Sequence, residues 1–289
     1  SLIAQGNPLD TSLMYGVMVH GKAAEKFAKD YGFENARLYP DHKSMLENEE
    51  LDAVSVCTYN MTHAECTIDA LRAGVNVLLE KPFTVTLEEA VEVMKAEKET
   101  GRKLMIGQVC RCTPAFALTK KLISEGAIGE LFFVESEYAH DYAVARGAND
   151  WRVTPERHGI IGGGCHAVDL LRWIAGDPAQ VTAYSTHKYL TDWPVNDTTI
   201  AIFRFPNEVI GKVFCSIGVK RDYTMRTCLY GTEGTIIFES RGTEMKLYQC
   251  DKNGKCELLH VAAVTGAREG RYIGSKTPVT VDQLTPAII

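Results

Sequence analysis

The 289-residue sequence lacks several features that would place it in particular classes of protein. It has no apolar run of the roughly 18 residues that a membrane span needs, so we expect no membrane partner. Acidic residues outnumber basic ones and the net charge is -6, which argues against nucleic acid as a partner, because such binding needs a basic face. No two cysteines stand in a Cys-x-x-Cys pair, so zinc and dithiol sites of that spacing are excluded.

The cysteines also lack the pattern of a disulfide framework. Their number, nine, is odd, and they are scattered along the chain. Most stand in apolar contexts, such as Cys57 and Cys215. We therefore expect reduced thiols in a cytoplasmic protein. Cys110 and Cys112 are separated by a single residue, which does not suit a metal pair, and we assign no metal ligands.

What is present is an ordinary globular composition, with 45% hydrophobic and 24% charged residues, in a chain long enough for about two domains. Short apolar strands alternate with amphipathic helices in the first part, which is typical of a doubly wound parallel sheet. We expect the tail of a helix and a loop within residues 2–14, strands at 16–19, 37–39, 53–57, 77–79 and 104–106, and helices at 23–31, from Asp41, at 63–73 and at 87–100.

The pattern changes at residues 108–112, and we divide the chain into domains 1–110 and 111–289. Turn signals separate most of the later strands, which predicts a mostly antiparallel sheet. The expected fold class is thus α/β: a Rossmann-type parallel sheet, then an α+β domain with a large open sheet. In the second domain we expect helices at 114–125 and 165–175, and strands at 131–138, 181–187, 198–205, 209–219, 227–230, 235–239 and 246–249.

The strand expected at 77–79 ends on two charges, Glu80 and Lys81, before Pro82 stops the ladder. Ligands bind at the carboxyl ends of strands in open α/β sheets. A lysine beside a glutamate at the edge of an apolar environment can exchange a proton near neutral pH. Lys81 is therefore the first candidate for chemistry. A plain strand end with a surface ion pair is the alternative.

A second polar group follows the strand expected at 53–57. Thr58, Asn60 and His63 stand between that strand and the next helix, where polar groups and a helix N-terminus can face a cofactor. Asn60 and Thr62 are also common helix caps, so a capping role is left open. Arg111, which follows the strand at 104–106, is a further candidate for the cofactor cleft.

A third group surrounds the glycine run 162–164. His166 and Asp169 are three residues apart, so they share a helix face, and a histidine near a bound alcohol or ketone can act as acid or base. A phosphate-binding glycine loop fits poorly, because it needs a preceding strand and a Gly-x-Gly-x-x-Gly order. Trp151 and Arg152 are weaker candidates for substrate contact; a loop arginine is usually solvated.

Three strings together resemble one family. They are Thr-x-Asn-x-x-His (58–63), Ala-Gly-x-x-Val-Leu-x-Glu-Lys-Pro (73–82) and Gly-Gly-Gly-x-His-x-x-Asp-Leu-x-x-Trp (162–173). Over roughly residues 16–240 the chain resembles the glucose–fructose oxidoreductase / inositol dehydrogenase / MocA-type family. The resemblance implies a Rossmann domain for NAD or NADP, and a C-terminal sheet that holds the substrate and builds a homodimer or homotetramer. It also implies oxidation or reduction of a hydroxyl or carbonyl on sugars, cyclitols or related small molecules.

The resemblance also implies roles for single residues. Lys81 matches the lysine between nicotinamide and substrate, with Glu80 and Pro82 as its neighbours in the motif. His166 matches the histidine taken as acid or base, and Asp169 a residue that orients it. By the same resemblance Thr58, Asn60 and His63 belong to the loop that contacts the dinucleotide. The central prediction is that Lys81 and His166 converge on one crevice.

The sequence departs from the family pattern in two places. Many members carry an aspartate four residues before the histidine, where this chain has Gly162. The first strand, its glycine turn and the acid that binds the ribose are not found, and His20 stands near the expected position of that acid. We expect either that the chain is a fragment of the working enzyme or that it does not bind the dinucleotide well, and we also expect that the C-terminus is cut short. The second case defines an alternative function: a non-catalytic relative that binds a small metabolite or a protein partner.

Overall fold

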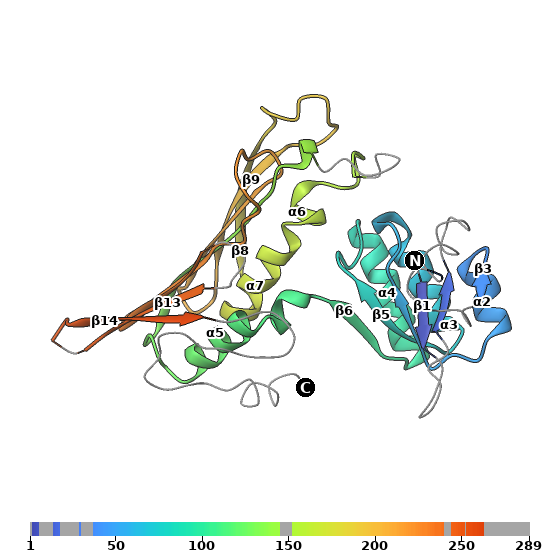
Figure 1. Cartoon of the computed structure of the whole chain (residues 1–289), viewed down its shortest axis with the longest axis horizontal. Helices are drawn as coiled ribbons and strands as arrows, with labels where there is room; N and C mark the ends of the chain where they lie inside the picture. The colour runs from blue at the N-terminus through green and yellow to red at the C-terminus, as the bar shows by residue number, and fades with distance from the viewer. Residues whose placement is uncertain are drawn as a thin grey trace. The chain divides into compact units, whose positions relative to one another are not determined.

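The chain folds into two compact units, Ser1–Gly107 and Gln108–Ile289 (Figure 1). The computed structural model describes residues 2–5, 14–17, 29, 37–144, 152–239, 244–251 and 253–262. None of the helices in these ranges combines the length and the apolarity that crossing a membrane requires.

The first unit is built on a six-stranded sheet with the order β3-β2-β1-β4-β5-β6. The pairs β2·β3, β4·β5 and β5·β6 are parallel, as expected for a Rossmann-type sheet. Val56 of β4 and Leu79 of β5 are fully inaccessible in the core of this unit. The strands are β1 (Leu2–Gln5), β2 (Met14–Val17), β3 (Leu38–Tyr39), β4 (Ala53–Val56), β5 (Asn76–Glu80) and β6 (Leu104–Gly107).

The expectation of a helix tail within residues 2–14 is wrong for Leu2–Gln5, which is a strand. It lies between β2 and β4 and runs antiparallel to both. A segment this short gains almost no i→i−4 hydrogen bonds as a helix, whereas a strand between two others pairs its backbone groups on both sides. The helix expected at 23–31 falls outside the described residues except for Lys29, which is helical.

The helices of the first unit begin where the sequence predicts. Asp41 caps α2 by accepting a hydrogen bond from the Ser44 amide at 2.8 Å. Thr86 and Glu89 form a reciprocal capping box at the start of α4. Each cap satisfies backbone N–H groups that have no partner inside the helix. The helical segments are α2 (His42–Asn48), η1 (Asn60–Thr62), α3 (His63–Arg72) and α4 (Leu87–Thr100).

The second unit is built on an eight-stranded sheet with the order β14-β13-β12-β11-β7-β10-β9-β8. Only β7·β10 is parallel among its described pairs, which agrees with the expected mostly antiparallel sheet. The edge strand β14 is absent from the sequence prediction, because its exposed, partly polar residues give a weak signal. The strands are β7 (Leu131–Ala139), β8 (Gln180–Thr186), β9 (Thr198–Arg204), β10 (Ile210–Ser216), β11 (Thr227–Gly231), β12 (Gly234–Glu239), β13 (Glu244–Cys250) and β14 (Cys256–Ala262).

The helices of the second unit pack on one face of this sheet (Figure 1). Leu170 and Leu171 of α7 are fully buried there, and the rings of Phe116 and Phe238 lie 5.1 Å apart. The short helix α6 was not predicted from the sequence. The helical segments are η2 (Val109–Cys112), α5 (Pro114–Ser124), η3 (Tyr142–Val144), α6 (Gly159–Gly162) and α7 (Cys165–Ala175).

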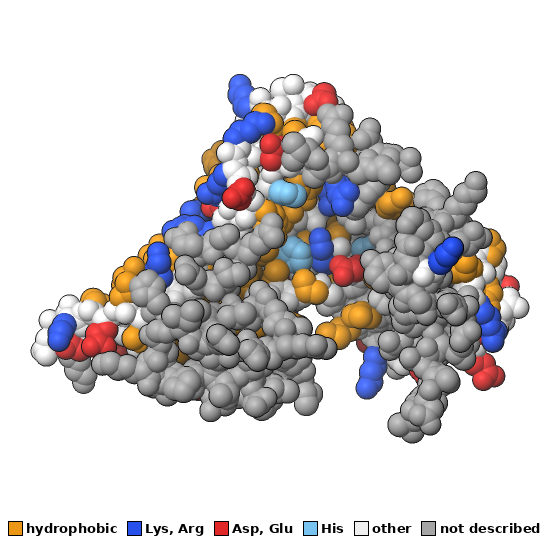
Figure 2. Space-filling model, viewed as in Figure 1, with side chains coloured by type: hydrophobic (Ala, Val, Ile, Leu, Met, Phe, Trp, Pro, Cys, Tyr) orange, Lys and Arg blue, Asp and Glu red, His pale blue; other side chains and the backbone are white. Residues whose placement is uncertain are grey.

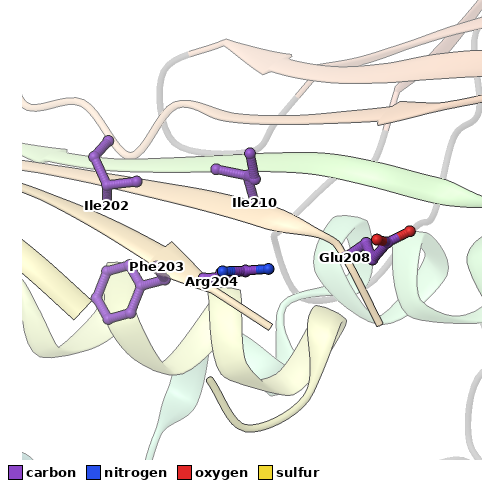
Figure 3. A pocket seen from close by; sticks show the side chains of 5 residues that line it. All are labelled: Ile202, Phe203, Arg204, Glu208 and Ile210. Atoms are coloured by element: carbon purple, nitrogen blue, oxygen red, sulfur yellow. The ribbon is translucent and has the colours of Figure 1, made fainter. Parts of the chain in front are cut away.

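The opposite face, here called the open face, carries no helix in the described part of the chain. Alternate residues of β8, β9 and β10 expose apolar side chains on it: Tyr184 of β8, Ile200 and Ile202 of β9 and Ile210 of β10 are 40 to 76% exposed. A shallow pocket at the β9–β10 end is lined by Ile202, Phe203, Arg204, Glu208 and Ile210 (Figure 3). The sheet therefore buries one face and presents the other.

The expectation of nine reduced thiols is wrong for one pair. Cys250 and Cys256 form a disulfide, whereas the other seven cysteines stand outside any disulfide. The two residues are directly opposite each other on β13 and β14, and the turn between them brings their sulfur atoms together. The sequence marks that turn, Asp-Lys-Asn-Gly, but not the strand that follows it.

Candidate functional site

The candidate residues of the first unit gather at the carboxyl ends of β4 and β5. These strands are parallel neighbours, with Val56 paired to Leu79, so the segments that follow them leave the same edge of the sheet. The segment 57–62 follows β4 and the segment 81–83 follows β5. This is the edge at which doubly wound sheets bind ligands.

His63 joins the two segments. Its side chain is buried at the start of α3, with Nδ1 2.7 Å from the Pro82 carbonyl oxygen and Nε2 3.3 Å from the Thr58 carbonyl oxygen. Burial lowers the pKa of His63, against the effect of these carbonyl groups, so we assign a neutral ring. Both partners are carbonyl oxygens, which only accept, and a neutral ring carries one N–H, so we place the proton on Nδ1, which donates to the closer Pro82 oxygen. This hydrogen bond ties the segment 81–83 to the start of α3, directly after the segment 57–62, without a charge on the ring.

Asn60 is 5% exposed, and its amide nitrogen Nδ2 has no hydrogen-bond partner among the described residues. A buried donor without a partner is costly in a folded protein unless a ligand or water accepts its hydrogen bond. The capping role left open for Asn60 and Thr62 is not seen, since neither side chain accepts a capping hydrogen bond and the Thr62 hydroxyl donates to the Tyr59 carbonyl at 2.9 Å. The donor at Asn60 fits a ligand rich in acceptors, such as a dinucleotide.

Glu80 and Lys81 end β5, where the Lys81–Pro82 peptide bond is cis. The Glu80 carboxylate turns back and accepts a hydrogen bond from the Lys81 backbone N–H at 3.1 Å. Gly107 of β6 lies beside it, and a methyl group there would be 3.6 Å from the Glu80 carboxylate oxygen. The negative charge therefore stays beside the backbone, and the Lys81 side chain is half-buried at the strand end.

In the second unit, His166 lies in the first turn of α7 and is 7% exposed. Its Nδ1 is 3.5 Å from the sulfur of Cys110 on η2, and that sulfur is 3.9 Å from the sulfur of Met225. The histidine is thus fixed against a buried thiol from a neighbouring element. The sequence does not reveal the contact between Cys110 and His166, because these residues are 56 positions apart.

Arg111 and Asp169 form an ion pair with two hydrogen bonds. Nε and Nη2 of Arg111 donate to the two carboxylate oxygens of Asp169 at 2.8 and 2.6 Å. The hydrogen bonds to Asp169 raise the pKa of Arg111, and the guanidinium also lies 5.9 Å from the Trp173 ring centre. The pair fixes η2, which carries Cys110, to α7, which carries His166. Arg111, predicted to face a cofactor cleft, is therefore part of the second unit and engaged with Asp169.

The glycine run allows large side chains to approach the backbone. A methyl group at Gly162 would lie 2.8 Å from Cζ of Arg157, and one at Gly163 would lie 2.2 Å from the Tyr138 ring. The run joins α6 to α7 and does not follow a strand, so it is no phosphate-binding loop of the Gly-x-Gly-x-x-Gly kind. At the position where many family members carry an aspartate, this chain has Gly162, and the guanidinium of Arg157 packs against it.

The structure thus forms two groups from the predicted residues. Thr58, Asn60, His63, Glu80, Lys81 and Pro82 belong to the first unit, and Arg111, Arg152, His166 and Asp169 to the second. Trp151 lies outside the described residues. Arg152 is half-buried. The sequence analysis does not select Arg157. A run of glycines near an arginine is a signal that could identify it, because glycines leave space beside the backbone that a large side chain can fill.

One group of possible metal ligands occurs in the described residues. Ligand atoms of His42, Glu65 and Asp69 lie within 4.8 Å of one another. The ammonium of Lys43 is 3.1 Å from Glu65 and 3.6 Å from Asp69, so a cation already faces both carboxylates. His42 also contacts the sulfur of Cys66 at 3.7 Å. The group is therefore described as an ion-pair cluster between α2 and α3.

Comparison with known proteins identifies the two units. A model described as "Oxidoreductase family, NAD-binding Rossmann fold" matches residues 10–108, and one described as "GFO/IDH/MocA C-terminal domain" matches residues 116–237. Levoglucosan dehydrogenase of Pseudarthrobacter phenanthrenivorans is 28% identical over 267 residues, covering 80% of this chain and 67% of that protein. Inositol 2-dehydrogenase 2 of Saccharopolyspora erythraea is 29% identical over 219 residues, covering 75% and 62%.

A solved structure titled "Levoglucosan dehydrogenase, complex with NADH and levoglucosan" is similar, with a TM-score of 0.78 and 26% identity over 93% of this chain and 76% of that one. The chain spans only about two thirds of the length of the curated relatives named above, 67% and 62%. The two domain matches, in the order and place of the two units, nevertheless agree with the resemblance in the sequence. The chain belongs to the GFO/IDH/MocA family of oxidoreductases.

Proposed function

We propose that the protein is an NAD(P)-dependent oxidoreductase that acts on a hydroxyl or carbonyl carbon of a sugar, cyclitol or related small molecule. The first unit is the dinucleotide-binding domain and the second is the substrate-binding domain. The observation that carries the proposal is the polar edge at the carboxyl ends of β4 and β5, where His63 holds the Asn60 and Pro82 segments together. The orphaned Asn60 donor supports a bound ligand at this edge.

The proposal gives each candidate residue a role. Asn60 donates to the cofactor, and Thr58, His63, Glu80 and Pro82 shape the edge that receives it. Lys81 exchanges a proton with the substrate oxygen through Nζ. The bound nicotinamide supplies or accepts the hydride.

In the second unit His166 is the alternative to Lys81 for moving this proton, through Nε2, because its Nδ1 faces the Cys110 sulfur. Asp169 keeps α7 in place through Arg111 and so orients His166. Arg152 and Trp151 are proposed to contact the substrate. Lys81 and His166 then serve one reaction, as the sequence predicts.

The first experiment is calorimetric titration of the 289-residue chain with NADH and with NADPH. Stoichiometric binding of either, weakened at least tenfold in Asn60→Ala, supports the proposal. Ser124→Ala, an exposed helix-end substitution in the second unit, is the matched control and should leave binding unchanged. Absence of binding by both this chain and any longer form of the protein would favour the alternative, a non-catalytic relative that binds a metabolite or a protein partner.

We also propose that the protein forms a homodimer or homotetramer through the open face. Apolar side chains exposed together on a sheet face mark an interaction surface more often than a solvated one. Ile202 and Ile210, at 44 and 47% exposure, are among the residues that line the pocket of Figure 3. Ion pairs of Glu135 with Lys212 at 2.6 Å and with Arg226 continue the same face across the central strands. Charged pairs of this kind suit an interface that is partly polar.

A further inference from the structure

Cys110 contacts the candidate histidine of the second unit from a neighbouring element. Its sulfur is 3.5 Å from Nδ1 of His166, and the two residues are 8 and 7% exposed. The adjacent Arg111 pairs with Asp169, one turn further along α7, and so holds η2 against that helix. The Cys110 carbonyl accepts a hydrogen bond from the Thr113 amide at 3.1 Å. The contact between the thiol and the imidazole is therefore fixed by bonds on either side of it.

The chemistry of the groups decides the direction of this hydrogen bond. A thiol carries one proton, and the Cys110 sulfur contacts two acceptors, Nδ1 of His166 and the sulfur of Met225 at 3.9 Å. An imidazole nitrogen with a lone pair is a good acceptor, whereas thiol and thioether sulfurs are both weak ones. The S–H group therefore donates to Nδ1, because the opposite arrangement would replace this bond with bonds that sulfur accepts.

The direction of the bond determines which ring nitrogen carries the proton. In a neutral imidazole one nitrogen donates and the other accepts, so the partner of one nitrogen sets the state of the other. A carboxylate beside Nδ1 would place the proton there and leave Nε2 as a base. A thiol that donates to Nδ1 does the reverse, and Nε2 of His166 then carries the proton. Gly162, at the position where many family members have an aspartate, supplies no carboxylate.

We propose that Cys110 is a positioning residue that holds His166 as a neutral hydrogen-bond donor, and that Lys81 moves the proton of the reaction. The inference rests on the proposed function and decides between its two candidates for that step. When an alcohol is oxidised, its C–H bond breaks with hydride transfer to the nicotinamide, and its O–H proton passes to Nζ of Lys81 in the amine form. The Nε2–H bond of His166 stays intact and donates to the substrate oxygen, where negative charge develops.

The first test reads the state of the ring directly. The histidines are labelled with nitrogen-15, and the signals of His166 are assigned by their loss in His166→Gln. Spectra recorded where the ring is neutral distinguish a nitrogen that carries a proton from one that does not. We expect a protonated Nε2 and a bare Nδ1, and the same state in Cys110→Ser, since a hydroxyl also donates. A wild-type ring with its proton on Nδ1 would overturn the inference.

The second test separates a hydrogen-bond donor from a proton carrier. Single-turnover hydride transfer is measured with NAD and NADP on sugars and cyclitols that include D-glucose and myo-inositol. His166→Ala should slow the transfer by roughly 100- to 1,000-fold, the cost of removing one donor to the developing charge. His166→Gln should recover at least about tenfold of this loss, because an amide N–H donates but takes up no proton. An equal loss in both variants would make His166 the proton carrier, which overturns the inference and leaves the oxidoreductase function standing.

Variants of the thiol complete the test. Cys110→Ala should slow hydride transfer by roughly 10- to 100-fold, because the ring loses its fixed orientation, whereas Cys110→Ser should keep most of the rate. Cys228→Ala removes another buried thiol of the second unit and should transfer hydride at the wild-type rate. Circular dichroism verifies that all variants are folded. Cys110→Ala at the wild-type rate would overturn the inference. The expected state of the ring without hydride transfer by the wild type would instead refute the proposed function.

Discussion

The ion pair between Arg111 and Asp169 gives the most quantitative prediction. The Asp169 side chain is 10% exposed and the Arg111 side chain is 43% exposed, so the two partners differ in how much solvent they keep. Removing Arg111 leaves a carboxylate that is shielded from water and has lost its counterion. Removing the Asp169 charge leaves a guanidinium that can still reach solvent beside Trp173. The two single substitutions should therefore have unequal costs.

Fully buried pairs lose about 3–5 kcal/mol when one partner is removed, and exposed pairs contribute about 1 kcal/mol or less. This pair lies between those limits. We expect Arg111→Met to lower the free energy of unfolding by about 3 kcal/mol and Asp169→Asn by about 1.5 kcal/mol. The double variant should cost about 1.5 kcal/mol less than the sum of the two single variants, because the ion pair is already lost after the first substitution and the second has nothing further to remove.

The assay is urea unfolding of the four proteins, followed by circular dichroism, at low and at high salt. The coupling should persist in part at high salt, since the Asp169 carboxylate is shielded from the solvent although 43% of the Arg111 side chain is exposed. Lys121, which pairs with Glu125 at 3.8 Å on the exposed face of α5, is the matched control, and Lys121→Met should cost less than about 0.5 kcal/mol. A coupling below about 0.5 kcal/mol, or a larger cost for Asp169→Asn than for Arg111→Met, would refute the reasoning.

Three other predictions concern separate parts of the chain. Hydrogen bonds to Cys66 and to Asp69 raise the pKa of His42 from 6.5 to about 9, so the stabilisation of the fold by protonated His42 is complete below pH 6.5 and lost towards pH 9. We expect the free energy of unfolding to fall by about 1–2 kcal/mol between these pH values. This dependence on pH should be absent in His42→Gln. Alkylation of the unfolded, unreduced protein should modify seven cysteines by mass spectrometry, and nine after reduction; nine without reduction would contradict the disulfide. Ile202→Glu should convert the proposed oligomer to monomers by light scattering, with Val91→Glu on the exposed side of α4 in the first unit as the control; an unchanged mass would exclude the open face.

The sequence predicts the elements that carry a strong local signal. The apolar runs at 53–57 and 77–79, and the caps at Asp41 and Thr86, each specify their element with nearby residues alone. The strand at Leu2–Gln5 and the edge strand β14 were missed, because both depend on pairing with strands elsewhere in the chain. The disulfide was missed with β14, since its two cysteines face each other only once that strand is paired.

The residues of the candidate site also fall into those that the local sequence predicts and those that depend on distant parts of the chain. The polar residues at strand ends follow from local order, so Thr58, Asn60 and Lys81 were found from the sequence. The contacts of Cys110 with His166 and of Arg157 with Gly162 were not, because contact between residues on different elements leaves no periodic pattern. The roles assigned to these residues, the cytoplasmic location and the convergence of Lys81 with His166 stay predictions.

The proposed reaction depends on Lys81, and single-turnover kinetics of Lys81→Ala in the full-length protein test this most directly. The measurement follows hydride transfer with saturating cofactor and the best substrate of the wild type, while a separate titration gives the affinity for NADH. We predict that hydride transfer slows by roughly 100- to 10,000-fold, the range for loss of a general acid or base, while the NADH affinity changes by less than about fivefold. Transfer at a near-normal rate with every substrate would contradict the account.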